Sequence, residues 1–351
     1  APPHSYSVGM RPDPRVREQV NWAQFGPGLR RGHYESFYQR ANHPTEPLAF
    51  WLRYTVFSPA RRPEAAVGEL WAVVFDGRAG GGHAVAKVEV PIAACAFATD
   101  RFDVRIGDGP AAAVLGPRGL RGAAGEIGWS LAYAGDEPPV YLLPRGLYRG
   151  GFPKAKSLVG VPLARYDGVV RVGDRRIEVD GWLGSQNHNW GSRHTDRYAF
   201  GQVAGFDNAQ GSFLEVATAR NRVGPVRTPA LTLMVLRHAG REHELTGLLR
   251  ARRHATGRYD HTGEDFTWEF ASESDEVRVS GKMVAPRSAF VGLAYADPPG
   301  RVKYCLNTKI ARCLLTIVDH RTGASDLLVS EHGGLFEILT DDRVHGVTIR
   351  A

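Results

Sequence analysis

Residues 181–198 hold the densest group of side chains that could do chemistry in this chain. The stretch contains two histidines, two tryptophans, two arginines, two asparagines, an aspartate and a tyrosine. Histidine and tryptophan bury well, whereas buried arginine, asparagine and aspartate need hydrogen-bonding partners. A mixture of the two kinds is typical of a pocket wall, where a few polar groups converge on an apolar ligand. We therefore place the candidate site here.

The spacing within this stretch indicates acid–base chemistry. His188 precedes Trp190 by two residues, which puts both rings on one face of an extended strand. An imidazole can move a proton, and an indole face can stabilise a carbocation beside it. Protonating an alkene requires a strong acid in a dry pocket, which a buried carboxyl with a raised pKa supplies. The candidates are Asp196 and Glu215, and we favour Glu215 because apolar residues flank it.

Residues 181–198 have two other interpretations, a metal site and a purely structural role. His188, His194 and Asp196 are residue types that bind zinc or iron, but their spacing matches no motif of known metal geometry, so we predict no metal site. In a purely structural interpretation, the two tryptophans are core residues, and Asn187 and His188 are hydrogen-bonded residues at a strand turn. The residue types alone do not separate this interpretation from the catalytic one.

A second polar and aromatic cluster covers residues 33–40. Strand alternation predicts one face with Tyr34, Ser36, Tyr38 and Arg40, and an opposite face with His33, Glu35, Phe37 and Gln39. Glu35 would then lie between aromatic rings, either lining a ligand cavity or paired with a nearby arginine. We favour the pairing with arginine.

The composition excludes several classes of protein. The 351 residues are 43% hydrophobic and 23% charged, which suits two packed domains. The net charge of +7 comes from arginines scattered singly or in pairs, so we predict no nucleic-acid partner. Three cysteines without CxxC spacing argue against a disulfide framework or a zinc ribbon. Cys305 and Cys313 are expected to be free, buried thiols on one face of a strand.

The membrane and the secretory route are not indicated. No apolar run reaches the roughly 18 residues that a membrane span needs, so we predict no transmembrane span. The first residues show no basic region followed by an apolar stretch, and the cytoplasm is the expected location. Motifs of serine hydrolases, phosphate-binding loops and zinc proteases are also absent.

The elements that must position these residues are strands. Many short runs of β-branched and aromatic residues alternate with Gly, Pro, Asp and Asn turns, which is typical of all-β sandwiches and barrels. Residues 198–206 and 212–218 are expected to form a hairpin that carries Glu215. Other predicted strands cover 48–57, 70–75, 85–90, 169–172, 177–179, 230–237, 266–270, 276–280, 312–318, 335–339 and 347–349.

The remaining segments suggest how the chain is divided. Residues 14–24 could form one short helix, and the Ala-, Gly- and Pro-rich residues 108–125 look like a long loop or covering flap. Nothing repeats as βαβ, which argues against a nucleotide-binding sheet. We expect an N-terminal extension over 1–25, a first β domain over 26–196 and a second over 197–351.

The two clusters together resemble a known family. The Tyr34–Tyr38 strand and the Gly181-Trp182 … His188-Asn189-Trp190-Gly191 segment look like the carotenoid 1,2-hydratase (hydroxyneurosporene synthase) and AttH-like group. Tocopherol cyclases are similar more distantly. The resemblance implies two tandem lipocalin-like antiparallel β-barrel domains with an apolar cavity near their interface. It also implies cofactor-independent protonation of a double bond in a terpenoid or other lipophilic substrate, followed by water addition or ring closure.

Carried over to this sequence, the resemblance matches His188 and Trp190 to the His-x-Trp pair of the hydratases. Their Tyr-x-Asp pair, about one hairpin later, has its nearest counterpart in Phe213-Leu214-Glu215, which keeps a carboxyl and loses the phenol. This departure puts carotenoid hydration itself in doubt. The AttH-like group also includes members without an assigned activity.

Two functions from different classes follow. The leading hypothesis is a cofactor-free hydro-lyase, cyclase or isomerase for a hydrophobic isoprenoid or polyketide substrate, with Glu215 or Asp196 as acid and His188 as proton relay. The alternative is a lipocalin-like carrier that binds a lipophilic small molecule unchanged. A buried carboxyl with a raised pKa would favour the enzyme, and a cavity lined only by paired polar groups would favour the carrier. The predicted binding residues are Trp190, Trp182, Asn187, Tyr198, Glu35 and Tyr38.

Overall fold

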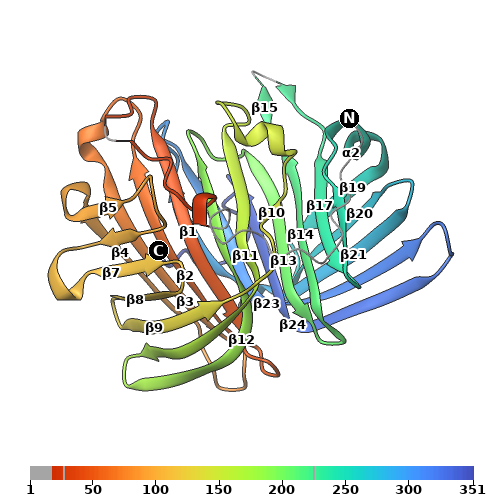
Figure 1. Ribbon diagram of the computed structural model, residues 1–351, viewed down its shortest axis with the longest axis horizontal. Coiled ribbons are helices and arrows are strands. Elements are labelled where there is room, and N and C mark those ends of the chain that lie inside the picture. Colours follow the sequence, from red (N-terminus) through yellow and green to blue (C-terminus); the bar gives the residue numbers. More distant parts are fainter. Residues whose placement is uncertain (1–17, 27, 224–225) are drawn as a thin grey trace.

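The computed structural model describes residues 18–26, 28–223 and 226–351, and nearly all of its regular structure is β. Two large sheets divide the chain between them, and every pairing within them is antiparallel. Figure 1 shows the sheets side by side, the first coloured red to yellow-green and the second green to blue. The prediction of an all-β chain with two tandem lipocalin-like barrel domains is confirmed.

The first sheet has twelve strands in the order β4-β3-β2-β1-β12-β11-β9-β8-β7-β6-β5, with β10 paired to β11. Its strands are β1 (His33–Asn42), β2 (Leu48–Ser58), β3 (Val67–Asp76), β4 (Ala84–Pro91), β5 (Cys95–Phe97), β6 (Val104–Ile106), β7 (Ala113–Gly116), β8 (Gly119–Ala124), β9 (Ile127–Ala134), β10 (Val140–Tyr141), β11 (Ala155–Val172) and β12 (Arg175–Gly191). Short 3-10 helices are η1 (Pro63–Ala65), η2 (Ile92–Ala94), η3 (Gly109–Ala111) and η4 (Arg145–Tyr148).

The second sheet has ten strands in the order β18-β17-β14-β13-β24-β23-β21-β20-β19, with β22 paired to β23; β15 and β16 pair separately. Its elements are β13 (Arg197–Phe206), β14 (Ala209–Arg220), β17 (Leu231–His238), β18 (Arg241–Leu245), α2 (Leu248–His254), β19 (Ala255–Asp260), β20 (Asp265–Glu273), β21 (Val277–Pro286), η5 (Arg287–Ala289), β22 (Val291–Ala296), β23 (Val302–Asp319) and β24 (Ser325–Thr340). The separate ribbon is β15 (Arg222–Val223) and β16 (Val226–Arg227).

Burial distinguishes the strands that face solvent from those that lie between the domains. Along β9 burial alternates residue by residue, because only one face of that strand meets the core. All ten residues of β1 are buried, as are nearly all of β2 and β3. The inner face of β1 contributes Phe37 and Ala41 to the core of the first barrel. The outer face contributes Tyr38 to a cluster shared with the second barrel.

The outer faces of the two barrels therefore pack against each other. Tyr38, Trp51, Trp71, Val73 and Phe75 of the first domain belong to one apolar cluster with the core of the second. A smaller cluster joins Val140 and Val159 to Phe213. We call this contact zone the interdomain layer, and its buried polar residues include Arg40, Asn42, Arg53, Ser185, Asn187, Gln202, Glu215, Asn307, Lys309 and Glu337.

Several expectations about local structure need correction. Residues 108–125 are not a flap, because β7 and β8 lie there and bury Ala113, Leu115 and Leu120 in the first barrel. Alanine and glycine lower strand propensity, but barrel packing outweighs that preference. Residues 347–349 form only an isolated bridge, from Gly292 to Ile349. Of the expected helix over 14–24, residues 14–17 lie outside the described chain, and helix is present only at Glu18 and Gln19.

Candidate functional site

His188 lies inside the first barrel in a buried group that we call the barrel triad: His33, Glu35 and His188. Strand pairing aligns Phe37 with His188 and Glu35 with Trp190, so these side chains share the inner face of β1 and β12. Glu35 Oε1 lies 2.7 Å from His188 Nε2, and Glu35 Oε2 lies 3.0 Å from His33 Nε2. Glu35 thus pairs with two histidines, and the predicted pairing with arginine is wrong.

The hydrogen bonds define where the protons of the barrel triad reside. Burial by itself raises the pKa of Glu35, but bonds from His188 and His33 outweigh it and lower the pKa to about 2. Glu35 is therefore ionised at neutral pH and accepts from His188 Nε2. The other ring nitrogen, Nδ1, lies 2.8 Å from the backbone oxygen of Val20, which can only accept. Both ring nitrogens of His188 are therefore engaged by oxygens of the protein, Nε2 by the Glu35 carboxylate and Nδ1 by the Val20 backbone.

The N-terminal segment 18–25 closes the barrel over this triad. Besides the Val20 contact, the backbone N–H of Gln24 donates to Glu35 Oε1 at 2.7 Å. Asn21 and Gln186 exchange two side-chain bonds, at 2.9 and 2.8 Å. A Cβ at Gly160 would stand 2.1 Å from Gln186 Oε1, so only glycine permits this approach. With the segment in place, His188 has no ring nitrogen left for a substrate.

Aromatic rings complete the surroundings of His188. Phe37 stacks on its ring with centroids 4.3 Å apart, and Trp190 lies tilted at 4.6 Å. The predicted shared face of His188 and Trp190 is thereby confirmed. Trp182, six residues before His188 on β12, is 3% exposed and belongs to the core of the first barrel, where it stacks on Phe50. Trp182 is thus a packing residue in this structure.

Glu215 belongs to the interdomain layer. The predicted hairpin of β13 and β14 is present, and it pairs Glu215 with Gln202 across the strands. Gln202 Nε2 donates to Asn187 Oδ1 at 2.9 Å, and Asn187 is the neighbour of His188 along β12. Successive side chains of a strand point to opposite faces. Glu215 and His188 therefore lie on opposite sides of the first sheet, and the expected pairing of these two residues is wrong.

The environment of Glu215 keeps its carboxyl protonated. The residue is 1% exposed, and its Oε2 has no hydrogen-bond partner among the described residues. Burial raises its pKa to about 8, because no cation or donor of the described residues offsets the loss of water around the carboxylate. Burial, followed by the charges of Glu337 and Glu215, also raises the pKa of Tyr38. Glu215 is therefore a neutral acid at pH 7, beside a phenol that stays protonated.

A hydrogen-bonded network surrounds Gln202 in the same layer. Its Oε1 accepts from Arg40 Nε at 3.1 Å and from Ser185 Oγ at 2.5 Å. Asn187 Nδ2 donates to Ser185 Oγ at 2.9 Å. Because side chains of β1, β12 and β13 all take part, the network fixes the first barrel against the second.

A buried ion pair lies across the layer from this network. Lys309 Nζ lies 2.8 Å from Glu337 Oε1, and it also donates to Asn307 Oδ1. The same ammonium lies 5.4 Å from the centre of the Trp51 ring, within range of a cation–π contact. The bulge between Thr308 and Ala311 shapes the strand around Lys309.

The other predicted residues are dispersed. Asp196 lies in the connection between the sheets, where it accepts from Arg193 at 2.8 Å and lies 3.5 Å from Lys303 Nζ. It is paired with cations and is not the isolated acid that alkene protonation requires. Tyr198 lies on the outer face of β13, and burial, then Cys305 and Glu337, raise its pKa. His194 stacks on Tyr34 with centroids 3.9 Å apart.

The sequence analysis missed Lys309, Glu337 and Gln202, and it assigned no role to Arg40. The one available signal was a lysine in the strand-like run 308–315, in which Thr308 and Arg312 are the other polar residues, because a charge there must be partnered if the strand is buried. No such signal marked Gln202. Its role comes from pairing with strands that are distant in sequence.

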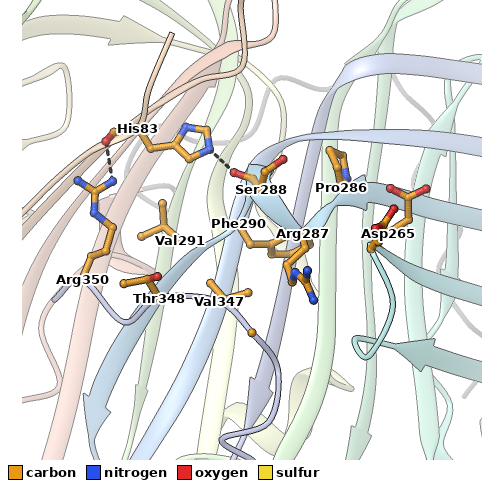
Figure 2. Close-up of a pocket in the computed structure, with 12 residues that line it drawn as sticks. His83, Asp265, Pro286, Arg287, Ser288, Phe290, Val291, Val347, Thr348 and Arg350 are labelled. Atoms are coloured by element: carbon orange, nitrogen blue, oxygen red, sulfur yellow. Dashed lines mark hydrogen bonds between the residues drawn. The ribbon is translucent and has the colours of Figure 1, made fainter. Parts of the chain in front are cut away.

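A pocket of about 530 Å³ opens at the edge of the interdomain contact, away from these groups. Figure 2 shows His83 of the first domain bonded through Nε2 to the Ser288 oxygen at 3.1 Å, and Arg350 donating to the His83 oxygen at 2.7 Å. None of its lining residues is a buried polar group without a partner. We therefore interpret this pocket as a surface groove where the two domains meet, and not as the reaction site.

Comparison with known proteins identifies the fold. Solved structures with the same architecture include a putative AttH from Nitrosomonas europaea (TM-score 0.55, 13% identity, 91% of this chain and 96% of that one). The structure of kievitone hydratase from Nectria haematococca has a TM-score of 0.55 and 11% sequence identity, and the match covers 88% of this chain and 89% of that one. The structure of CghA with Sch210972 has a TM-score of 0.57 and 12% sequence identity, and the match covers 96% of this chain and 97% of that one.

Sequence comparison adds relatives without a known activity. Uncharacterized proteins from two strains of Mycobacterium tuberculosis are 24% identical over 283 residues, which is 80% of this chain and 80% of theirs. No family model matches the sequence. Within the described residues no helix is long and apolar enough to cross a membrane. The chain shares the two-domain fold of AttH and kievitone hydratase, which confirms, at the level of the fold, the AttH-like resemblance of its sequence.

Proposed function

We propose that this protein is a hydratase, cyclase or isomerase that acts on a lipophilic small molecule in the interdomain layer, with Glu215 as the acid. The observation that carries the proposal is the position of Glu215: a fully buried carboxyl whose Oε2 meets no partner among the described residues. A neutral carboxyl in a dry, aromatic-lined site is poised to give a proton to a substrate.

In the proposed reaction Glu215 gives its proton to one carbon of a carbon–carbon double bond. The oxygen of a water molecule, or a second double bond of the substrate, bonds to the other carbon. In hydration the added water gives a proton back to the Glu215 carboxylate, so the acid is restored. In cyclisation or isomerisation, the proton returns from a carbon of the substrate. Tyr38 and Tyr198 would form part of the wall.

His188 receives a different role from the one that its sequence suggested. Both of its ring nitrogens bond to protein groups, and it faces the interior of the first barrel. We propose that it is a positioning residue, which holds β1 and β12 in the register that sets Asn187 and Arg40 toward the layer. It would not exchange protons with the substrate.

The solved relatives support an enzyme of this kind. One structure with the same fold is, by its name, a hydratase, and another was solved with the small molecule Sch210972. The alternative, a carrier that leaves its ligand unchanged, is favoured by the many polar groups of the layer that pair with each other, such as Lys309 with Glu337. The raised pKa of Glu215 favours the enzyme, because a carrier has no use for an unpaired acid.

The test combines ligand capture with turnover. Wild-type protein is incubated with isoprenoid and polyketide libraries, and the bound compounds are identified by native mass spectrometry. Each bound compound is then incubated with the protein, and the products are analysed for the mass gain of one water or for an isomer of equal mass. Glu215→Gln keeps the shape of the side chain and removes the acidic proton. We expect it to bind the same species and to lose about 10²–10⁴-fold in turnover.

The matched control is Glu269→Gln, on strand β20 of the same domain, whose carboxylate is exposed and paired with Lys282. It should retain wild-type turnover. Equal turnover by wild type and Glu215→Gln would disprove the role of Glu215. A ligand that binds tightly and leaves unchanged would identify the protein as a carrier.

A further inference from the structure

Three hydrogen-bond donors in the interdomain layer are buried and find no acceptor among the described residues. They are Arg40 Nη2, Trp51 Nε1 and Asn307 Nδ2, each on a side chain that is at most 2% exposed. A buried donor without a partner costs about 1–3 kcal/mol, so native proteins seldom retain one without a reason. Three of them in one layer indicate a place where an acceptor from outside the chain binds.

The contacts show that these donors belong to one locality. Arg40 and Trp51 are direct partners in the register of β1 and β2, so both side chains project from the same face. The amide oxygen of Asn307 accepts from Lys309, whose ammonium lies 5.4 Å from the Trp51 ring. Asn42 joins the two sides, because it accepts from Arg40 Nη1 at 2.8 Å and donates to the Lys309 backbone oxygen at 2.6 Å.

The charges of this locality leave a positive excess. Arg40 is 0% exposed, and its acceptors are the neutral oxygens of Gln202, Asn42 and Gly333. No carboxylate pairs with it among the described residues. Lys309 has Glu337 as its counter-ion, so that carboxylate does not compensate Arg40. A buried guanidinium without a counter-ion is costly, and a bound anionic oxygen would relieve that cost.

We propose that Arg40, Trp51 and Asn307 form an oxyanion subsite that binds a carbonyl or carboxylate oxygen of the substrate. The substrate is then an α,β-unsaturated carbonyl compound, in which the reacting double bond is conjugated to that oxygen. This inference rests on the proposed function, since it names the substrate class for the same site. An isolated alkene fits the layer less well, because its protonation would create a carbocation beside the buried Arg40 cation.

The reaction of such a substrate uses both the acid Glu215 and the three unpartnered donors of the interdomain layer. The oxygen of water bonds to the β carbon, and the π electrons move onto the carbonyl oxygen, where the three donors hold the negative charge. The electrons return to form a C–H bond at the α carbon with the proton of Glu215. The added water gives its extra proton to the Glu215 carboxylate, so that one water is added and the acid is restored.

Paired probes test the subsite without requiring turnover. Farnesoic acid and farnesol share one carbon skeleton, and only the acid carries a conjugated carboxylate. Calorimetric titration of the wild-type protein at pH 7 should show the acid bound about tenfold more tightly, as expected for hydrogen bonds to a charged group. Trp51→Phe keeps an aromatic ring but removes the N–H together with the five-membered ring of the indole, and it should lose most of this preference. Arg40→Lys, which removes Nη2 and keeps the charge, should weaken the preference as well.

Trp71→Phe is the matched control. Trp71 is also 2% exposed and lies in the same apolar cluster, but its Nε1 already donates to Glu69 Oε2 at 3.0 Å. It should keep the preference for the acid. No preference in the wild type, no binding of the acid, or equal losses in Trp51→Phe and Trp71→Phe would overturn the inference. A preference for the acid with no turnover of any enone would refute the proposed function and leave the subsite intact.

Discussion

Glu35 and Glu215 are both fully buried glutamates on strands of the same protein, yet at pH 7 the first is ionised and the second is neutral. Glu35 accepts from His33, His188 and the backbone of Gln24, which lower its pKa to about 2. Glu215 has none of these donors, and burial raises its pKa to about 8. The difference comes from the partners and not from the depth of burial, because both residues are excluded from water to the same extent.

The comparison separates a structural site from a chemical one. In the barrel triad both carboxylate oxygens of Glu35 and both ring nitrogens of His188 have partners, and the segment 18–25 covers the group. The interdomain layer is incomplete, with an acid and three donors that lack partners among the described residues. Groups without partners cost stability and persist where a ligand uses them. The same substitution, glutamate to glutamine, should therefore have opposite effects on stability at the two positions.

The largest effect is expected at the barrel triad. Glu35→Gln removes the carboxylate that His33, His188 and the backbone of Gln24 share, and leaves these buried groups with a neutral amide in its place. We expect a loss of about 3–5 kcal/mol in the free energy of unfolding at pH 7, measured by urea denaturation. A loss below about 1 kcal/mol would show that the triad does not depend on the charge of Glu35. Since its folded pKa lies below 4.5, the Glu35 contribution is present above that pH and fades as the pH falls toward 2.

The second effect has the opposite sign. The folded pKa of Glu215 lies above its unfolded value of 4.5, so its favourable contribution is complete below pH 4.5 and is lost as the pH rises toward 8. Glu215→Gln removes this dependence. We expect the variant to be more stable than wild type at pH 8, on the order of 2–3 kcal/mol, with the difference shrinking toward pH 5. If the stability difference between wild type and Glu215→Gln were the same at pH 5 and pH 8, the raised pKa of Glu215 would be contradicted.

A smaller effect should follow from loosening the segment that covers the triad. Asn21→Ala removes the reciprocal bonds to Gln186 and leaves that buried amide with unsatisfied groups. We expect a loss of about 1–2 kcal/mol. Hydrogen exchange should also increase at the backbone N–H of Gln24, which donates to Glu35. Unchanged exchange there would show that the segment is held independently of Asn21.

The smallest effect is expected at Asp196, whose partly exposed carboxylate pairs with Arg193. Asp196→Asn should cost less than about 1 kcal/mol, and the difference should decrease further in 1 M NaCl because salt screens exposed pairs. A cost as large as that of Glu35→Gln would place Asp196 in a buried network and contradict this ranking.

Local patterns predicted the features that depend on neighbouring residues in the chain. Alternation placed Glu35 with Phe37 and His188 with Trp190, and the apolar flanks of Glu215 indicated a buried acid. Alternation failed where a bulge interrupts a strand. Cys305 and Cys313 were expected on one face, but Cys313 pairs with Met283, which points into the second barrel, whereas Cys305 contacts Glu337 in the interdomain layer. The register shift near Lys309 separates them.

The sequence by itself determined that the chain is all β, that two domains follow each other, and that Glu215 is a candidate acid, because these follow from period-two patterns and from immediate neighbours. Only the tertiary structure decided that Glu35 pairs with histidines and that His188 and Glu215 lie on opposite sides of one sheet. It alone brought Arg40, Trp51 and Asn307 together, since these contacts join strands far apart in the chain. Their register depends on how two barrels pack, which no local pattern records.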